Sequence, residues 1–146
     1  MEAAMAGSLL RAGHGVTVYN RTPNKAEGLV DRGAHQAARV ADACRGHAVI
    51  TMLADDDAVQ GVAFGEGGVL QSLGRSAVHV SMSTISVALC ERLADTHAAA
   101  GQRFVAAPVF GRPDAAALGK LLTIAGGDPE VIGRDGYPDR RDDGQD

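Results

Sequence analysis

Residues 78–106 read VHVSMSTISVALCERLADTHAAAGQRFVA, and this stretch decides the fold. Val78–Met82 has the composition of a buried strand. Ser86–Ala100 carries apolar residues at helical spacing and is followed by Gly101, which predicts an amphipathic helix with a glycine at its C-terminal end. Phe104–Ala106 predicts another short strand. A strand, a helix and a strand in this order predict a right-handed crossover between two parallel strands.

The same alternation extends from this stretch towards both ends of the chain. Helices are predicted where apolar residues recur at helical spacing, or where a start signal such as Thr22-Pro23 occurs. The predicted helices are Glu2–Ala12, Pro23–Arg32, Arg39–Arg45 and one that begins at Asp55–Asp57. The further predicted strands are Val16–Tyr19, Ala48–Leu53 and Leu121–Ala125. Strands that alternate with helices predict an α/β fold of the Rossmann type, with a doubly wound, mostly parallel sheet.

The composition limits the classes of partner. The chain has 146 residues, of which 45% are hydrophobic, 22% charged and 3% aromatic, with a formal net charge of −4. Because aromatic residues are scarce and the balance of charge is acidic, we expect no nucleic-acid partner and no membrane surface. No apolar run is long enough to span a bilayer, and the first residues do not resemble a secretory signal. We therefore expect a cytoplasmic protein.

The cysteines and histidines show no metal-binding pattern. Cys44 and Cys90 stand alone without a C-x-x-C spacing, so we expect both to be small buried residues. No pair among the five histidines has the spacing of metal ligands on one helix face, and no metal site is expected.

Residues 133–146 are rich in Asp, Arg and Gly, so we expect a disordered or foreign tail after a domain of residues 1–132.

Four motifs follow one another along the chain: MEAAMAGSLLRAGH at 1–14, MLAD at 52–55, STIS at 83–86 and APVFGRPDAA at 107–116. Together they resemble the β-hydroxyacid dehydrogenase superfamily of 3-hydroxyisobutyrate and 6-phosphogluconate dehydrogenases. The last motif is similar to the imine-reductase-like branch of that superfamily. The resemblance covers residues 1–132. It implies the NAD(P)-binding domain of an oxidoreductase that transfers hydride between NADP(H) and a small β-hydroxyacid-, aldehyde- or imine-like substrate.

The resemblance also implies where the cofactor would bind. The positions are Met1, Asn20, Arg21, Thr22, Leu53, Ala54 and Thr84. An acidic residue at the end of the second strand of such a domain favours NAD, whereas an arginine nearby accommodates the 2′-phosphate of NADP. This chain has Arg21 there and no acid, so NADP is expected, with NAD as the second candidate. A solvated arginine in a turn is the alternative for Arg21.

The substrate positions that the resemblance implies are Ser83, Thr84, Gly111 and Arg112. Phe110 and Arg112 depart from the family, which has serine and glycine at these positions, so the usual clamp on a substrate carboxylate is altered. For Arg112, binding of an acid group and a surface salt bridge both stay open. Hydroxyls at the start of a helix can also cap it, and Ser86 is the expected cap.

Two parts of the family pattern have no counterpart in these residues. The first strand and the first two loop glycines would precede Met1, and Glu2 stands where the last loop glycine belongs. That strand is the central one of the sheet, so we expect two unpaired strand edges. The family's acid/base lysine lies on a second, helical domain, and neither Lys25 nor Lys120 has the sequence context of that lysine.

No catalytic residue is therefore assigned, and the isolated fragment is expected to be inactive. A non-catalytic Rossmann-like remnant or interaction module is the alternative reading. Another doubly wound protein, such as a methyltransferase, is a third, although the ordered motifs count against it. A small-molecule substrate is the expected partner, and full-length relatives are expected to be homo-oligomers.

Overall fold

The computed structural model describes residues 2–110, 122–123 and 126–127. The first half contains α1 (Glu2–Arg11), β1 (Thr17–Val18), the 3-10 helix η1 (Pro23–Ala26), α2 (Glu27–Val30), β2 (His35–Gln36), α3 (Val40–Ala43) and β3 (Ala48–Thr51). The second half contains α4 (Asp56–Phe64), α5 (Val69–Ser72), β4 (Val78–Ser81), α6 (Val87–Ala99), β5 (Arg103–Ala106), β6 (Val109–Phe110), β7 (Leu122–Thr123) and β8 (Gly126–Gly127). Helices and strands alternate as the sequence predicted.

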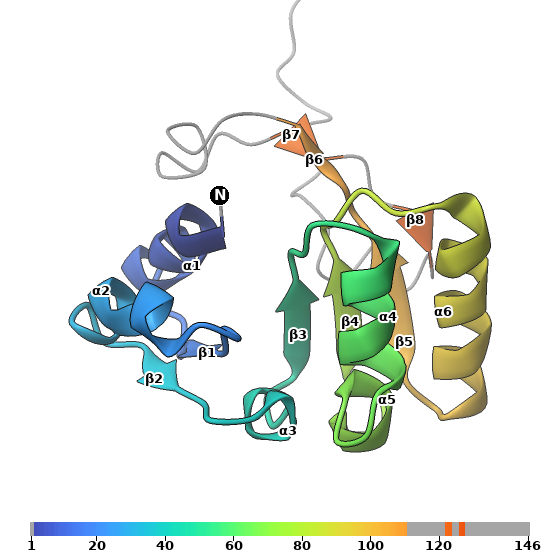
Figure 1. Ribbon diagram of the computed structural model, residues 1–146, viewed down its shortest axis with the longest axis horizontal. Helices are drawn as coiled ribbons and strands as arrows, with labels where there is room; N and C mark the ends of the chain where they lie inside the picture. The colour runs from blue at the N-terminus through green and yellow to red at the C-terminus, as the bar shows by residue number, and fades with distance from the viewer. Residues whose placement is uncertain (1, 111–121, 124–125, 128–146) are drawn as a thin grey trace, which may run out of the picture.

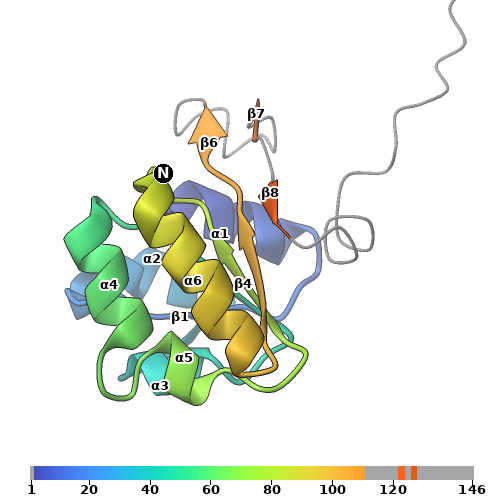
Figure 2. The ribbon, with the colours of Figure 1, turned by 90° about the vertical axis from the view of Figure 1, so that its right-hand side faces the viewer.

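The main sheet has the strand order β3–β4–β5–β8. β3, β4 and β5 are parallel, with Ala48 opposite Val78 and Val78 opposite Arg103, whereas β8 pairs antiparallel with β5. Helix α6 connects β4 to β5, which confirms the crossover predicted from residues 78–106. Helices α4 and α6 cover the same face of this sheet (Figures 1 and 2).

A second, smaller sheet is formed by β1 and β2, which are parallel with Thr17 opposite His35. Figure 1 shows these strands beside α1 and α2, apart from β3. Within residues 2–110 and the two short segments after them, no strand pairs with β3 on the side away from β4, and none joins β1 to β3. Among the described residues, one edge of β1 and one edge of β3 therefore have no strand partner, as expected for the middle of the sheet.

The core consists mainly of small and medium aliphatic side chains. Its largest cluster joins Val59 and Ala63 of α4 to Leu89 and Leu93 of α6 and to Phe104 of β5. A second cluster lies beneath α3 and α5 and consists of Cys44, Val69, Leu73 and Ala77. Cys44 is buried as predicted, whereas Cys90 is only partly buried, because it lies at the margin of the first cluster.

Two of the predicted helix starts are confirmed by their caps. The Ser86 hydroxyl accepts a hydrogen bond from the Leu89 amide at 3.2 Å, and Asp55 accepts one from the Ala58 amide at 2.9 Å. These side chains satisfy amides that have no partner within the helix.

The helix predicted for residues 23–32 is wrong in its extent. It is divided into η1 and α2 and ends at Val30, and Thr22 makes no side-chain cap. Instead, the backbone N–H of Thr22 donates to the Asn20 side chain at 2.9 Å, which fixes a local turn. Gly28 within α2 also lowers the helical propensity of this segment.

Four short elements were not predicted: β2, α5, β6 and β8. β2 consists of His35 and Gln36, both exposed, so it lacks the apolar alternation that indicates a strand. α5 follows a tight glycine turn in which Gly67 has φ +65°. A Cβ atom on Gly68 would lie 2.5 Å from the Val62 carbonyl oxygen, so the turn requires glycine there.

The predicted strand Leu121–Ala125 lies only partly within the described residues, where β7 takes up Leu122–Thr123. The predicted tail, residues 133–146, lies outside them. None of the helices in the described ranges is both long and apolar enough to cross a membrane.

Candidate functional site

The positions that the sequence predicted for the site lie just after the carboxyl ends of β1, β3 and β4. Asn20, Arg21 and Thr22 follow β1, Leu53 and Ala54 follow β3, and Ser83 and Thr84 follow β4. In open α/β sheets, ligands bind outside the carboxyl ends of the strands. Met1, Gly111 and Arg112 lie outside the described residues, so their predicted roles stay untested.

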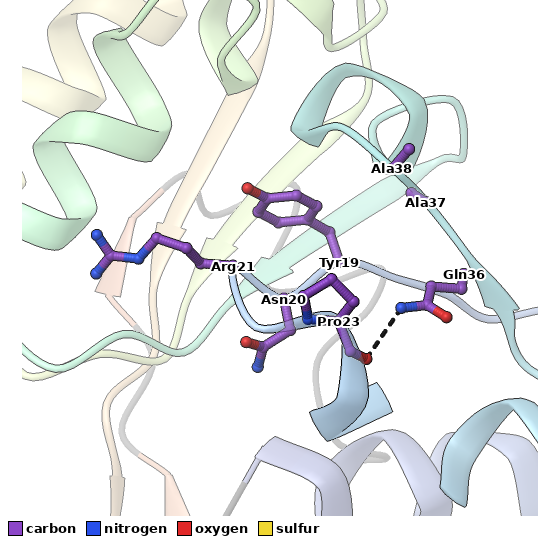
Figure 3. A pocket seen from close by; sticks show the side chains of 7 residues that line it. All are labelled: Tyr19, Asn20, Arg21, Pro23, Gln36, Ala37 and Ala38. Carbon is purple, nitrogen blue, oxygen red and sulfur yellow. Dashed lines mark hydrogen bonds between the residues drawn. The ribbon is translucent and has the colours of Figure 1, made fainter. Parts of the chain in front are cut away.

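A pocket of about 390 Å³ lies at the end of β1 (Figure 3). Its lining residues are Tyr19, Asn20, Arg21, Pro23, Gln36, Ala37 and Ala38. Gln36 Nε2 donates to the Pro23 carbonyl oxygen at 3.0 Å, which joins β2 to the turn after β1. Tyr19 lines this pocket and is 39% exposed, so part of its side chain is accessible to a ligand.

Arg21 supplies the positive charge of this pocket. Its side chain is exposed and extends to the opposite side from Gln36 (Figure 3). Within the described ranges it forms no hydrogen bond or ion pair, and no Asp or Glu lines the pocket. A guanidinium group with no competing carboxylate is suited to bidentate binding of a phosphate. Thr22 is adjacent but is not among the lining residues.

The loops after β3 and β4 are tied together by two hydrogen bonds. The Leu53 amide donates to Ser83 Oγ at 2.8 Å, and the Ser86 amide donates to Asp56 Oδ1 at 2.9 Å. The Ser86 side chain, together with the Ser86 amide, holds the pKa of the Asp56 carboxyl below its usual value. These two contacts fix the spacing of the loops at the edge of the sheet.

Ser83 and Thr84 differ in their exposure. The Ser83 side chain is buried, and its oxygen already accepts the Leu53 amide, whereas Thr84 is exposed. Ala54 is exposed as well, and Leu53 is half-buried. Thr84 and Ala54 are therefore accessible at this edge, while the Ser83 hydroxyl joins the loop after β4 to the loop after β3.

Sequence reasoning did not identify Tyr19, Gln36 or Asp56 as parts of this region. Tyr19 was read only as a strand residue, although it directly precedes Asn20 and Arg21. Gln36 could not be placed because β2 was not predicted. Asp56 was read as a helix-start residue, and its contact with Ser86 spans 30 positions of sequence.

The parallel sheet and the polar positions at its carboxyl edge define a nucleotide-binding α/β domain. The family model of the NAD-binding domain of 6-phosphogluconate dehydrogenase matches residues 1–134. This chain belongs to that family.

Two curated relatives are similar over most of the chain. The uncharacterized oxidoreductase YfjR of Bacillus subtilis is 51% identical over 137 residues, covering 90% of this chain and 46% of the relative. The 3-sulfolactaldehyde reductase of Escherichia coli is 38% identical over 136 residues, covering 92% of this chain and 45% of the relative. The chain thus spans about half the length of the relatives it matches.

Two solved structures support the same assignment. The 3-hydroxyisobutyrate dehydrogenase of Mycobacterium tuberculosis superimposes with a TM-score of 0.84 at 28% identity, covering 92% of this chain and 45% of that chain. The imine reductase of Myxococcus stipitatus in complex with NADP+ has a TM-score of 0.73 at 28% identity, covering 79% and 39%. The predicted fold class and the predicted NAD(P)-dependent oxidoreductase family are confirmed.

Proposed function

We propose that the protein containing this domain is an NADP(H)-dependent oxidoreductase that transfers hydride to or from a small β-hydroxyacid-, aldehyde- or imine-like substrate. The observation that carries the preference for NADP is the pocket after β1, where Arg21 is exposed and no carboxylate competes for it. An acidic residue at this point would instead bind the ribose hydroxyls of NAD and repel a 2′-phosphate.

The residues at the end of β1 divide the binding of the adenine side of the cofactor among them in this proposal. Arg21 pairs with the adenine-side phosphate, and Asn20 and Thr22 shape the turn that presents it, since the Asn20 side chain accepts the Thr22 amide. Tyr19 offers an aromatic face to the adenine, and Gln36 supports the opposite wall through Pro23.

The second half of the cofactor would lie against Leu53, Ala54 and Thr84. When bound, the nicotinamide ring supplies the hydride chemistry. The exposed Thr84 hydroxyl contacts the ligand. The buried Ser83 hydroxyl joins the loops after β3 and β4 through its hydrogen bond with the Leu53 amide. Gly111 and Arg112 complete the substrate side in this proposal.

Proton transfer must come from a group outside these positions. A neutral hydroxyl such as that of Thr84 orients a substrate but is a poor acid at neutral pH. The chain's lysines, Lys25 and Lys120, do not have the context of the family's acid/base lysine. The chain therefore supplies cofactor binding and one wall of the substrate site.

The preference for NADP is tested in a chimera in which residues 2–127 of this chain replace the equivalent residues of a full-length relative. Arg21→Ala should weaken NADPH binding by about 10- to 100-fold, the loss of a charge-assisted phosphate pair, and leave NADH binding unchanged. Lys25→Ala is the matched control, because Lys25 is exposed but does not line the pocket. Equal losses for both cofactors with Arg21→Ala would contradict the role.

One observation favours a non-catalytic Rossmann-like remnant or interaction module as a second candidate. Glu2 places an acidic side chain in the first turn of α1. The positive end of a helix dipole can attract the cofactor's pyrophosphate, and a carboxylate placed there weakens this attraction because it repels the phosphates. If the chimera binds neither NADPH nor NADH even with Glu2→Gly, the domain is a remnant that keeps the fold without the cofactor.

A further inference from the structure

A row of four polar side chains crosses the core between β3 and α6. Thr51 Oγ1 lies 2.9 Å from His79 Nε2, and His79 Nδ1 lies 2.9 Å from His97 Nε2. His97 Nδ1 lies 2.7 Å from Gln102 Oε1. We refer to Thr51, His79, His97 and Gln102 together as the histidine chain. None of these contacts is part of the site at the carboxyl edge of the sheet.

The histidine chain is sealed from solvent. Both imidazoles are 0% exposed, and Thr51 and Gln102 are 7% and 8% exposed. The Phe104 ring is stacked on His97, with centroids 5.6 Å apart, and meets His79 edge-on at 5.3 Å. The rings therefore lie beside the apolar cluster formed by α4, α6 and β5, where a charged imidazole is poorly solvated.

The hydrogen-bond partners fix where each proton lies. Gln102 Nε2 donates to the carbonyl oxygens of Leu70 and Leu73 at 3.0 and 2.8 Å, so its Oε1 faces His97 as an acceptor. His97 Nδ1 must then donate, which leaves its Nε2 to accept from His79 Nδ1. His79 Nε2 in turn accepts from the Thr51 hydroxyl.

This arrangement is complete with both imidazoles neutral. A further proton on His97 Nε2 would set it against the N–H of His79 Nδ1, because a charged imidazole has no acceptor nitrogen. A further proton on His79 Nε2 would turn the Thr51 hydroxyl from donor to acceptor and would leave a charge buried beside the apolar cluster. No carboxylate among the described residues forms a hydrogen bond or ion pair with either ring. The described groups that face them are uncharged, namely Thr51 at the end of β3, Gln102 just before β5, Phe104 within β5, and each other.

We propose that the histidine chain is a proton-sensitive contact between α6 and the sheet. It stabilises the packing of α6 while both imidazoles are neutral, and this stabilisation is lost when they take up protons. His79 belongs to β4 and His97 to α6, so the bond between them joins the helix to the centre of the sheet. Gln102 extends the same connection to the backbone of α5 and the residue after it.

The direction of the pH effect follows from burial. Burial and the neighbouring His97 lower the pKa of His79 from 6.5 to about 3, and burial lowers the pKa of His97 as well, with Gln102 opposing that shift. Because the folded pKa values lie below the unfolded ones, the unfolded chain binds more protons under acidic conditions. Stability is thus complete above an unfolded pKa of about 6.5 and falls as the pH decreases towards the folded values.

The experiment compares urea unfolding of the full chain with that of a variant carrying His79→Phe and His97→Leu, at pH values from about 7 down to about 4. For the unaltered chain, each buried histidine should raise the unfolding equilibrium constant by up to about tenfold for each unit by which the pH decreases below about 6.5. The variant should lose this part of the pH dependence. His35→Gln, which removes an exposed histidine, is the matched control and should keep it.

A second measurement on the unaltered chain decides the matter if the variant does not fold. Nitrogen NMR of the imidazoles at about pH 5 should show two neutral rings protonated on Nδ1, with the exposed His14, His35 and His47 as internal references. An unchanged pH dependence in a folded variant would overturn the proposal. Charged rings, or rings protonated on Nε2, in the folded chain would overturn it equally.

Discussion

Removal of the hydroxyl group from Ser83 should destabilise the fold, whereas its removal from the adjacent Thr84 should affect ligand binding instead. Ser83 is 3% exposed, and its oxygen accepts the Leu53 amide at 2.8 Å. Thr84 is exposed and makes no side-chain hydrogen bond to another described residue. Ser83→Ala therefore removes a partner that the fold uses, whereas Thr84→Ala removes one that only a ligand would use.

The magnitude follows from the group that is left behind. Ser83→Ala leaves the Leu53 amide without its acceptor, and an unsatisfied buried donor costs about 1–3 kcal/mol. Leu53 is half-buried, so water reaches part of this region, and we expect the lower half of that range. Thr84→Ala should change the free energy of unfolding by less than about 0.5 kcal/mol, as is usual for exposed positions.

Urea unfolding of the two variants, followed by circular dichroism, measures this difference directly. The midpoint for Ser83→Ala should decrease with an unchanged denaturant slope, and that for Thr84→Ala should stay at the wild-type value. In the chimera, Thr84→Ala should instead weaken NADPH binding. Equal destabilisation by both substitutions would refute the assignment of Ser83 to the fold and Thr84 to the ligand.

Three further predictions concern the core, the start of α1 and turnover. Leu93→Ala should reduce the free energy of unfolding by about 2–5 kcal/mol in a urea titration, because Leu93 of α6 is fully buried in the cluster with α4 and β5. In the chimera, Glu2→Gly should tighten NADPH binding about two- to fivefold in a fluorescence titration, since it removes a negative charge from the helix start. The 146-residue chain alone should show no NADPH-dependent turnover of β-ketoacids, short aldehydes or cyclic imines, whereas the chimera should be active. Turnover by the short chain would place an acid/base group within these residues.

Elements with strong local signals could be predicted from the sequence. The strand at 78–81, its capped helix and the strand at 103–106 were predicted because each combines a buried face with a recognisable start or stop. β2 was not predictable, because two exposed polar residues form it only where β1 is available as a partner. The helix after Thr22 was predicted too long because the Asn20 turn and Gly28 act against it.

The polar interactions between distant residues could not be predicted in the same way. His79 and His97 are 18 positions apart on a strand and a helix, and no short motif signals that their rings meet. A histidine on a strand and another on a helix do not show the spacing of metal ligands on one helix face. Arg21, by contrast, was identified because its position at the end of a strand carries meaning in this fold.

The separation of β1–β2 from the main sheet has a consequence for how the pocket after β1 is maintained. These strands have two residues each, and their ladder includes the hydrogen bonds from the His35 amide to Val16 and from the Ala37 amide to Val18, at 2.9 and 2.8 Å. A unit held by so few bonds opens at a lower free energy than β3–β4–β5, and its amides exchange with solvent sooner. A ligand at Arg21 that binds only the closed unit has an apparent Kd equal to its intrinsic Kd divided by the fraction of time that the unit is closed. Its binding slows amide exchange at His35 and Ala37. Ligand binding at Arg21 and the local folding of β1 and β2 are therefore coupled equilibria.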